Sequence, residues 1–246
     1  GGVVEDNAVG THEFLDLCEQ LDCEPYLAAN VGSGSPRELR EWVEYVNSAE
    51  GTLADERAAN GRKEPWNVRL WGVGNENWGC GGHMRPEYYA DEYRRYATYV
   101  QARPEAPVYR IACGPNEDDY NWTEVIMREC FKPMYGFSAM DGLSLHYYTI
   151  PGGWSDQRPA SPVSPDDWAD VMALGWRMDE IVRGHSAVMD RHDPEKKTAI
   201  IVDEWGAWYK AEEGTHPRFL FQQQTMRDGV LAALNLEIPQ AMRQLP

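Results

Sequence analysis

The chain has 246 residues, of which 42% are hydrophobic and 11% aromatic, enough for the core of one large domain or two small ones. Its formal net charge of −17 repels phosphate backbones and anionic lipid, so we expect no nucleic acid and no membrane partner, whereas neutral sugars are unaffected. No apolar run reaches the roughly 18 residues of a spanning helix, and residues 1–20 lack the order of a signal peptide, which leaves the compartment open.

The first predicted elements are a helix, a strand and a second helix. Thr11 is a candidate N-cap for a helix whose apolar residues recur at helical spacing as far as Leu21. A strand is predicted at about residues 26–31. Ser35 and Glu38 then have the spacing of a capping box, with Pro36 at the first helical position, so a second helix is predicted to begin there.

The alternation of strand and helix repeats along the rest of the chain. A polar loop is predicted over residues 48–66, and Pro86 is expected to open a helix that has tyrosines on one face. The other predicted strands are 68–73, 109–113, 142–147 and 198–203, and the other predicted helices are 121–131, 167–189 and 218–236. The sequence therefore predicts five strand-helix units.

Short, almost continuously apolar strands that alternate with longer helices indicate a parallel sheet covered by helices. Two architectures fit, a doubly wound sheet and a (β/α)8 TIM-barrel fold. No glycine-rich phosphate-binding motif follows any of the strands, which weighs against a nucleotide-binding sheet. No linker or composition shift divides the chain.

The cysteines and histidines do not form metal-binding motifs. Five cysteines are an odd number and include no CxxC pair, so free thiols are expected rather than disulfides or a zinc ribbon. The six histidines show no ligand spacing such as HExxH. We therefore expect neither a catalytic metal nor a cofactor.

Polar side chains gather at the ends of the predicted strands, where a barrel enzyme carries its working residues. They are Asn30, Asn75, Glu76, Asn116, His146, Tyr148 and Glu204. A retaining glycosidase needs one carboxyl group to protonate the leaving oxygen and a second, roughly 5 to 5.5 Å away, to attack the anomeric carbon. Glu76 and Glu204 are candidates for this pair. The alternative is that both are solvated loop carboxylates.

Other candidate residues also have a purely structural interpretation. His146 fits a buried, hydrogen-bonded histidine as well as a ligand to a carboxylate. Trp78, Trp154, Trp205 and Trp208 follow strands and are suited either to stack on sugar rings or to cover the core. Asn30 and Asn116 fit either substrate binding or a turn closed on their own backbone.

Several stretches together resemble the catalytic barrel of glycoside hydrolase family 51, whose best-known members are α-L-arabinofuranosidases. They are residues 4–7 (VEDN), 10–14 (GTHEF), 24–30 (EPYLAAN), 71–82 (WGVGNENWGCGG), 145–148 (LHYY) and 202–206 (VDEWG). The resemblance runs in order from about residue 2 to about residue 236, and the block around Glu76 is specific to the family.

The resemblance implies a role for each candidate. Glu76 is the general acid/base at the end of the fourth barrel strand, and Glu204 is the nucleophile at the end of the seventh. Tyr148 and His146 are expected to donate to Glu204 and to the acid, respectively, and Asn75 to bind the sugar 2-hydroxyl. Asn30, Trp78 and Trp205 complete the expected substrate-binding set.

The implied activity is the release of arabinofuranosyl units from an arabinose-containing polysaccharide such as arabinoxylan or arabinan. Two alternatives stay open: an endo-β-glucanase of the same family, and an inactive sugar-binding fragment. Residues 1–236 are expected to form a partial barrel domain with strands three to seven, and 237–246 a tail that does not match the family. Because such a remnant exposes parallel edges, we expect a homo-oligomer or an open partial barrel.

Overall fold

The computed structural model describes residues 4, 6–101, 107–131 and 140–238. They divide into two compact units, each described by itself below. The N-terminal unit comprises residues 4–114 and 124–143, and the C-terminal unit comprises residues 115–123 and 144–238, in both cases as far as they are described.

The N-terminal unit carries the first strands, each followed by a helix. Its strands are β1 (Tyr26–Ala29), β2 (Leu70–Val73), β3 (Tyr109–Ala112) and the first two residues of β4 (Gly142–Thr149). Its helices are α1 (Thr11–Leu21), α2 (Pro36–Asn47), α3 (Thr52–Ala59), α4 (Pro86–Ala97) and most of α5 (Tyr120–Cys130). The register is parallel, with Tyr26, Leu70 and Tyr109 side by side.

The core of this unit is aromatic where the strands meet α4. Trp71 of β2 and Ile111 of β3 are fully buried, as are Tyr89 and Tyr93 of α4. The two tyrosines lie one helical turn apart, which places them on the same face of α4 as predicted. Burial raises the pKa of both.

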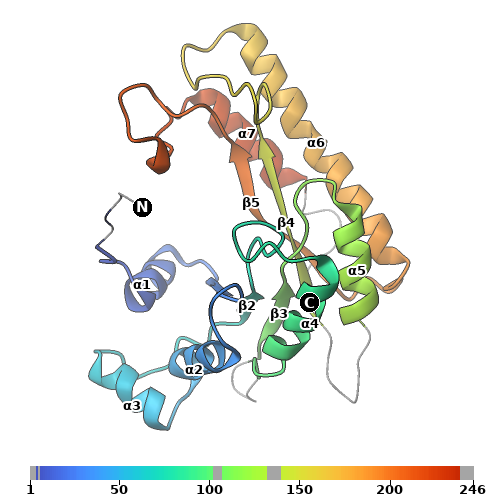
Figure 1. Cartoon of the computed structure of the whole chain (residues 1–246). Coiled ribbons are helices and arrows are strands. Elements are labelled where there is room, and N and C mark those ends of the chain that lie inside the picture. The colour runs from blue at the N-terminus through green and yellow to red at the C-terminus, as the bar shows by residue number, and fades with distance from the viewer. Residues whose placement is uncertain (1–3, 5, 102–106, 132–139, 239–246) are drawn as a thin grey trace. The chain divides into compact units, whose positions relative to one another are not determined.

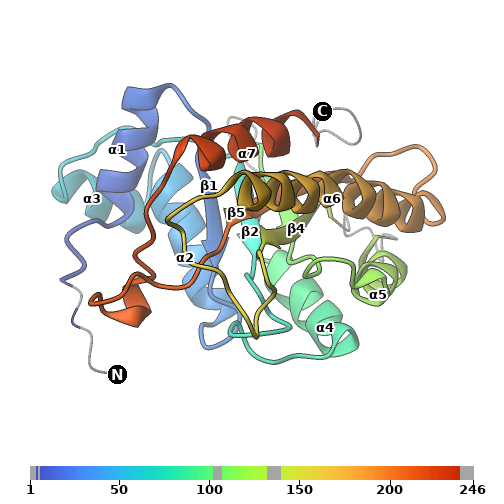
Figure 2. The same cartoon turned by 90° about the horizontal axis from the view of Figure 1, so that it is seen from above.

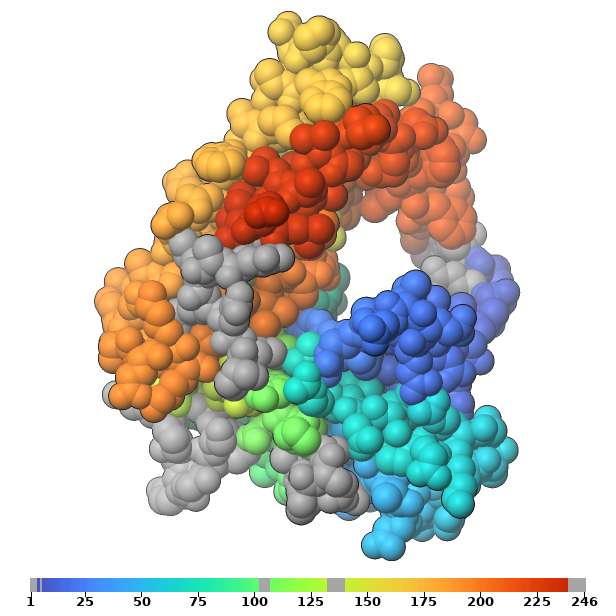
Figure 3. Space-filling model, turned by 180° about the vertical axis from the view of Figure 1, so that it is seen from behind, coloured from blue at the N-terminus to red at the C-terminus, as the bar shows by residue number. Residues whose placement is uncertain are grey.

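The C-terminal unit contains the rest of β4, strand β5 (Ala199–Ala207), the long helix α6 (Pro165–Asp190), a short 3₁₀ turn η1 (Pro217–Phe219) and α7 (Met226–Glu237). Helices α6 and α7 pack against each other and against β5 (Figures 1 and 2). Their buried contact includes Val171, Tyr209 and Leu231. The outer side of α7, drawn in red, faces the viewer in Figure 3.

The strand order confirms the barrel type of fold. Neighbouring strands hydrogen-bond in chain order, β1-β2-β3-β4-β5. In a doubly wound sheet the order reverses at a switch point, whereas in a (β/α)8 barrel it does not. The described residues therefore form five strands of a partial (β/α) barrel. Within the described residues, no helix is both long and apolar enough to cross a membrane.

The predicted loop over residues 48–66 was wrong, because it contains α3. The sequence TLADERAA has no clear apolar stripe, so its periodicity gave no helix signal. Tertiary contacts stabilise it instead: the buried guanidinium of Arg57 donates to the carbonyls of Tyr45 at 2.6 Å, Lys63 at 2.8 Å and Arg62 at 3.3 Å.

The last predicted helix, 218–236, was wrong at its start. The helix begins at Met226, after an N-cap at Thr225 whose backbone N–H and hydroxyl both donate to the Asp228 carboxylate. Likewise, α1 is capped by Gly10 rather than by Thr11, with the Glu13 carboxylate accepting from Gly10 N–H at 2.9 Å. The capping box of Ser35 and Glu38 is confirmed.

Strands β4 and β5 both extend beyond their predicted ends, so the candidate residues lie within them rather than after them. His146 and Tyr148 are in β4, and Glu204 and Trp205 are in β5. The Trp208 backbone N–H donates to the Thr149 carbonyl at 3.0 Å, so the two strands stay paired beyond these polar residues. Of the expected tail 237–246, only Glu237 and Ile238 are among the described residues.

Candidate active site

The loop after β2 presents Glu76 at a sharp turn of the N-terminal unit. Gly74 has φ +98°, and a Cβ there would lie 2.0 Å from the Asn77 side-chain oxygen. Glu76 itself has φ +47°, a left-handed conformation that costs a non-glycine residue on the order of 1 to 3 kcal/mol and is typical of functional sites. Its carbonyl accepts from the N–H groups of Gly79 and Gly81, at 2.8 and 2.9 Å. The loop thus holds the carboxylate at a fixed point.

Asn77 holds this loop together, a role that we did not predict. It is fully buried, and its side-chain amide donates to the Gly81 carbonyl at 2.8 Å. Its backbone carbonyl accepts from Met84 N–H at 2.7 Å. Its backbone N–H points to the Cys113 sulfur at 3.4 Å. Its position directly after a catalytic candidate in the sequence gave no indication that Asn77 is buried.

The side chains around Glu76 are held by the loop and by β3. The Cys80 thiol donates to Glu76 Oε2 at 3.1 Å. Trp78 is half-buried, and its indole N–H donates to Gly114 carbonyl at 3.1 Å. Asn75 is exposed next to the acid candidate. None of the five cysteines, all of which are described, forms a disulfide, as predicted.

Asn30 closes a turn of its own. Its side-chain oxygen accepts from Ser33 N–H at 3.0 Å and its amide donates to the Ser33 hydroxyl at 2.8 Å. This is the turn interpretation that the sequence left open. Asn116 is similarly engaged through its backbone, since it forms a parallel bridge with His146 in the C-terminal unit.

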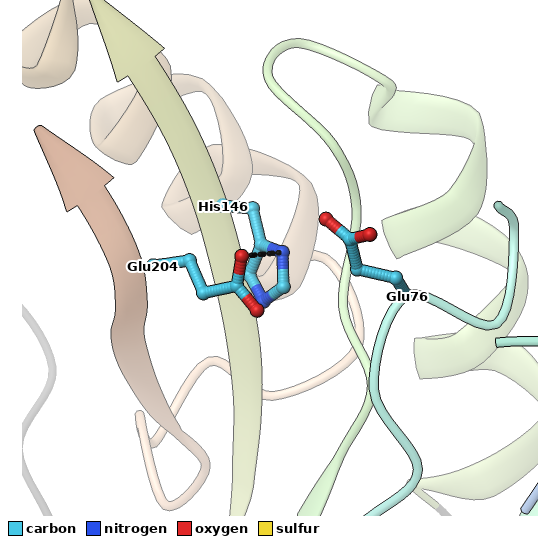
Figure 4. Close-up of side chains that lie close together, drawn as sticks. All are labelled: Glu76, His146 and Glu204. Carbon is cyan, nitrogen blue, oxygen red and sulfur yellow. Dashed lines mark ion pairs between the residues drawn. The ribbon is translucent and has the colours of Figure 1, made fainter. Parts of the chain in front are cut away.

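In the C-terminal unit, β4 and β5 bring Tyr148, His146, Asp203 and Glu204 together. The Tyr148 hydroxyl donates to Glu204 Oε2 at 3.0 Å, as predicted. His146 is buried, and its Nδ1 lies 3.5 Å from Glu204 Oε2 (Figure 4). Its Nε2 lies 3.2 Å from Asp203 Oδ1. Both distances are those of ion pairs, which form only when the imidazole is protonated.

These contacts place two carboxylates beside His146. The expected donation from His146 to the acid candidate stays a prediction. Only 11% of the Asp203 side chain is exposed, so its contact to His146 is shielded from solvent. The Glu204 side chain is 30% exposed, which leaves it open to a ligand.

Aromatic rings pack against Tyr148, the hydrogen-bond donor to the nucleophile candidate. Trp208 lies edge-on to Tyr148 at 5.0 Å and to Trp154 at 5.1 Å between ring centroids. Trp205, the tryptophan that we expected to bind substrate, is half-buried in β5 next to Glu204. Tyr148, Trp208 and Trp154 therefore form a row of aromatic rings that reaches Glu204 through the Tyr148 hydroxyl.

Residues 2–158 of the chain match the family model described as the alpha-L-arabinofuranosidase 1 domain. The chain belongs to this arabinofuranosidase family. The resemblance to glycoside hydrolase family 51 is thereby confirmed, and the family is one of glycoside hydrolases.

Named relatives agree with the family. The chain is 46% identical, over 97% of its own length, to an intracellular exo-alpha-L-arabinofuranosidase from Bacteroides ovatus, and 31% identical, over 83%, to a probable alpha-L-arabinofuranosidase C from Aspergillus niger. It covers 45% and 40% of those proteins, so it spans less than half the length of these arabinofuranosidase relatives.

Solved structures of the family have the same fold. The GH51 arabinofuranosidase from Xanthomonas axonopodis pv. citri superimposes with a TM-score of 0.90 at 49% identity, covering 97% of this chain and 47% of the other. An alpha-L-arabinofuranosidase from Thermotoga maritima in an arabinose complex gives 0.74 at 28% identity, covering 94% and 44%. These relatives carry the arabinofuranosidase name rather than that of the endo-β-glucanase alternative.

Proposed function

We propose that the protein carrying this chain is a retaining α-L-arabinofuranosidase that releases arabinofuranosyl units from hemicellulose or arabinan. Membership of the arabinofuranosidase family supports the activity. The observation that carries the mechanism is the hydrogen bond from Tyr148 to Glu204, because a donor to a carboxylate favours the ionised form that a nucleophile needs.

In the proposed first step, Glu204 attacks the anomeric carbon of the arabinofuranosyl unit and forms a glycosyl-enzyme ester. Glu76 gives its proton to the glycosidic oxygen, and the rest of the glycan leaves as an alcohol. In the second step, Glu76 takes a proton from water, the water attacks the same carbon, and Glu204 is released. The sugar keeps its anomeric configuration because it is inverted twice.

The remaining candidates have supporting roles in this proposal. Asn75 binds the 2-hydroxyl of the arabinofuranosyl unit, a contact that strengthens in the transition state. Tyr148 and His146 orient Glu204, and Asp203 orients His146 through its 3.2 Å contact. Trp78 and Trp205 contact the sugar, and Asn30 positions the loop after β1. No metal or cofactor takes part.

The test is hydrolysis of an aryl α-L-arabinofuranoside by the protein that carries this chain. Removing the nucleophile in Glu204→Ala is expected to lower kcat by on the order of 10³-fold or more. Glu76→Ala is expected to slow substrates with poor leaving groups far more than activated aryl substrates, because only the former need protonation. NMR of the first-formed product should show retained configuration.

Glu195→Ala is the matched control, because its side chain is 70% exposed and belongs to a loop of the C-terminal unit. Full activity of Glu204→Ala would disprove the nucleophile assignment. An inverted product would disprove the double displacement, and a folded wild-type protein that cleaves no arabinofuranoside would disprove the activity itself.

A further inference from the structure

The C-terminal unit contains a cavity of about 290 Å³ that the proposed chemistry does not use. Its lining includes Tyr148, Trp154, Leu174, Arg177 and Glu117. Ligand pockets range from about 300 to 1,000 Å³ for drug-sized molecules, so this one fits a single sugar ring rather than an oligosaccharide. The combination of aromatic faces with a few polar groups is typical of a binding pocket.

Trp154 is held in place by a tight turn after β4. Gly153 N–H donates to Ile150 carbonyl at 2.9 Å, and Arg158 N–H donates to Pro151 carbonyl at 3.1 Å. Gly152 has φ +84°, and a Cβ there would lie 2.0 Å from a backbone oxygen. Trp154 is nevertheless 58% exposed, and Trp208 supports it edge-on at 5.1 Å. The turn thus exposes a large flat ring that is already ordered, so little side-chain entropy of Trp154 would be lost when a ligand binds.

On the polar side of the cavity, the backbone of Glu117 is held by two hydrogen bonds. Glu117 N–H donates to His146 carbonyl at 2.8 Å, and Glu117 carbonyl accepts from the buried His185 ring at 2.7 Å. The Arg177 side chain is 42% exposed and its guanidinium lies 5.9 Å from the Tyr147 ring centroid. A guanidinium and a carboxylate together offer donors and acceptors to adjacent sugar hydroxyls.

The cavity is connected to the proposed chemistry through one side chain. Tyr148 lines the cavity, and its hydroxyl donates to Glu204 Oε2 at 3.0 Å. A ring bound in this cavity would therefore share Tyr148 with the nucleophile candidate. It would be a sugar of the remaining glycan, because the arabinofuranosyl unit that is cleaved must itself contact Glu204, and Glu204 is not among the residues that line the cavity.

The local charge favours a neutral ligand. Arg177 Nη2 lies 3.9 Å from Asp118 Oδ2, and Glu117 adds a second carboxylate to the same region. One guanidinium between two acids gives no net positive field for a uronic acid.

We propose that this cavity is a subsite for one neutral sugar residue of the glycan that carries the arabinofuranosyl group, stacked on Trp154 and hydrogen-bonded by Arg177 and Glu117. The inference rests on the proposed function for the identity of the glycan. Two backbones supply such a residue, xylan and arabinan, and the experiment separates them.

The test is calorimetric binding to the whole protein of three probes: xylotetraose, α-1,5-arabinotetraose and tetragalacturonate. The Glu204→Ala background is used throughout so that no probe is consumed. Trp154→Ala is expected to weaken binding of a neutral probe about five- to tenfold, the loss expected for one stacking contact. Trp154→Phe should lose less, and Arg177→Met should weaken the same probe. Whichever neutral probe responds identifies the backbone.

Trp176→Ala is the matched control, because Trp176 is 61% exposed on α6 and does not line the cavity. Equal binding by the Trp154→Ala and Trp176→Ala variants would overturn the subsite, as would tighter binding of tetragalacturonate than of both neutral probes, or no neutral binding at all. Failure of the proposed function is detected separately, as loss of aryl arabinofuranoside hydrolysis in a protein that still binds a neutral probe through Trp154.

Discussion

His185 shows how a single buried side chain couples the C-terminal unit to pH. Its Nε2 faces Glu117 carbonyl at 2.7 Å and its Nδ1 faces the Thr123 hydroxyl at 2.8 Å. A carbonyl only accepts, so Nε2 carries the proton and Nδ1 accepts from Thr123 in the neutral ring. Burial lowers the pKa of His185 below its ordinary value of about 6.5, although the Glu117 carbonyl and nearby acids oppose this.

We predict that the free energy of unfolding falls as the pH decreases from about 7.5 through 6.5, the ordinary histidine pKa. Below that pH the unfolded chain binds a proton that buried His185 does not, so acid favours unfolding. His185→Gln should make this part of the pH dependence flatter, as measured by urea unfolding at several pH values. His216→Gln is the control, because His216 is exposed in the same unit. An unchanged slope in His185→Gln would contradict the prediction.

At the scale of elements, helix α4 fixes the strand ends from which the Glu76 loop emerges. The fully buried Tyr89 hydroxyl donates to Val73 carbonyl at the end of β2 and accepts from Cys113 N–H just after β3. Its distances to those two atoms are 2.5 and 2.6 Å. One hydroxyl thereby joins the helix to two neighbouring strands next to the acid candidate.

Tyr89→Phe is expected to destabilise the protein by about 1 to 3 kcal/mol, because it leaves a buried carbonyl and N–H without that partner. Urea unfolding measures the loss. Tyr88→Phe is the matched control, since Tyr88 is its neighbour in α4 and is 52% exposed, and it should change stability by less than about 0.5 kcal/mol. Similar losses in both variants would show that the hydroxyl bridge contributes little.

At the scale of the whole molecule, the net charge opposes self-association whereas the sheet edges favour it. Among the described strands, β1 and β5 each have one hydrogen-bonded neighbour, so the far edge of each presents backbone groups that another strand can pair. The net charge of −17 repels a second copy. Self-association therefore stays a prediction, and ionic strength should control it.

We expect light scattering to show a larger fraction of oligomer in about 0.3 M salt than in 0.01 M salt, because screening shortens the range of the repulsion from roughly 30 Å to less than 10 Å. Glucose or another neutral solute at matched osmolality provides the control for nonionic effects. A monomer at micromolar concentration in both salts would contradict the prediction.

The order of strands and helices could be predicted from the sequence because it depends on local periodicity. The apolar runs that became β2 and β4, the tyrosine face of α4 and the capping box of Ser35 are each encoded within a few neighbouring residues. The motif around Glu76 and the LHYY stretch likewise identified the family before any geometry was known.

Other features depend on residues far apart in the chain, and only the tertiary structure decided them. His146 contacts Asp203 and Glu204, which lie more than 50 positions away. The cavity beside Trp154 combines residues from β4, from α6 and from the segment before α5. Local pattern determines which element each residue joins, whereas the partner of a buried charge or ring is determined only when distant segments pack.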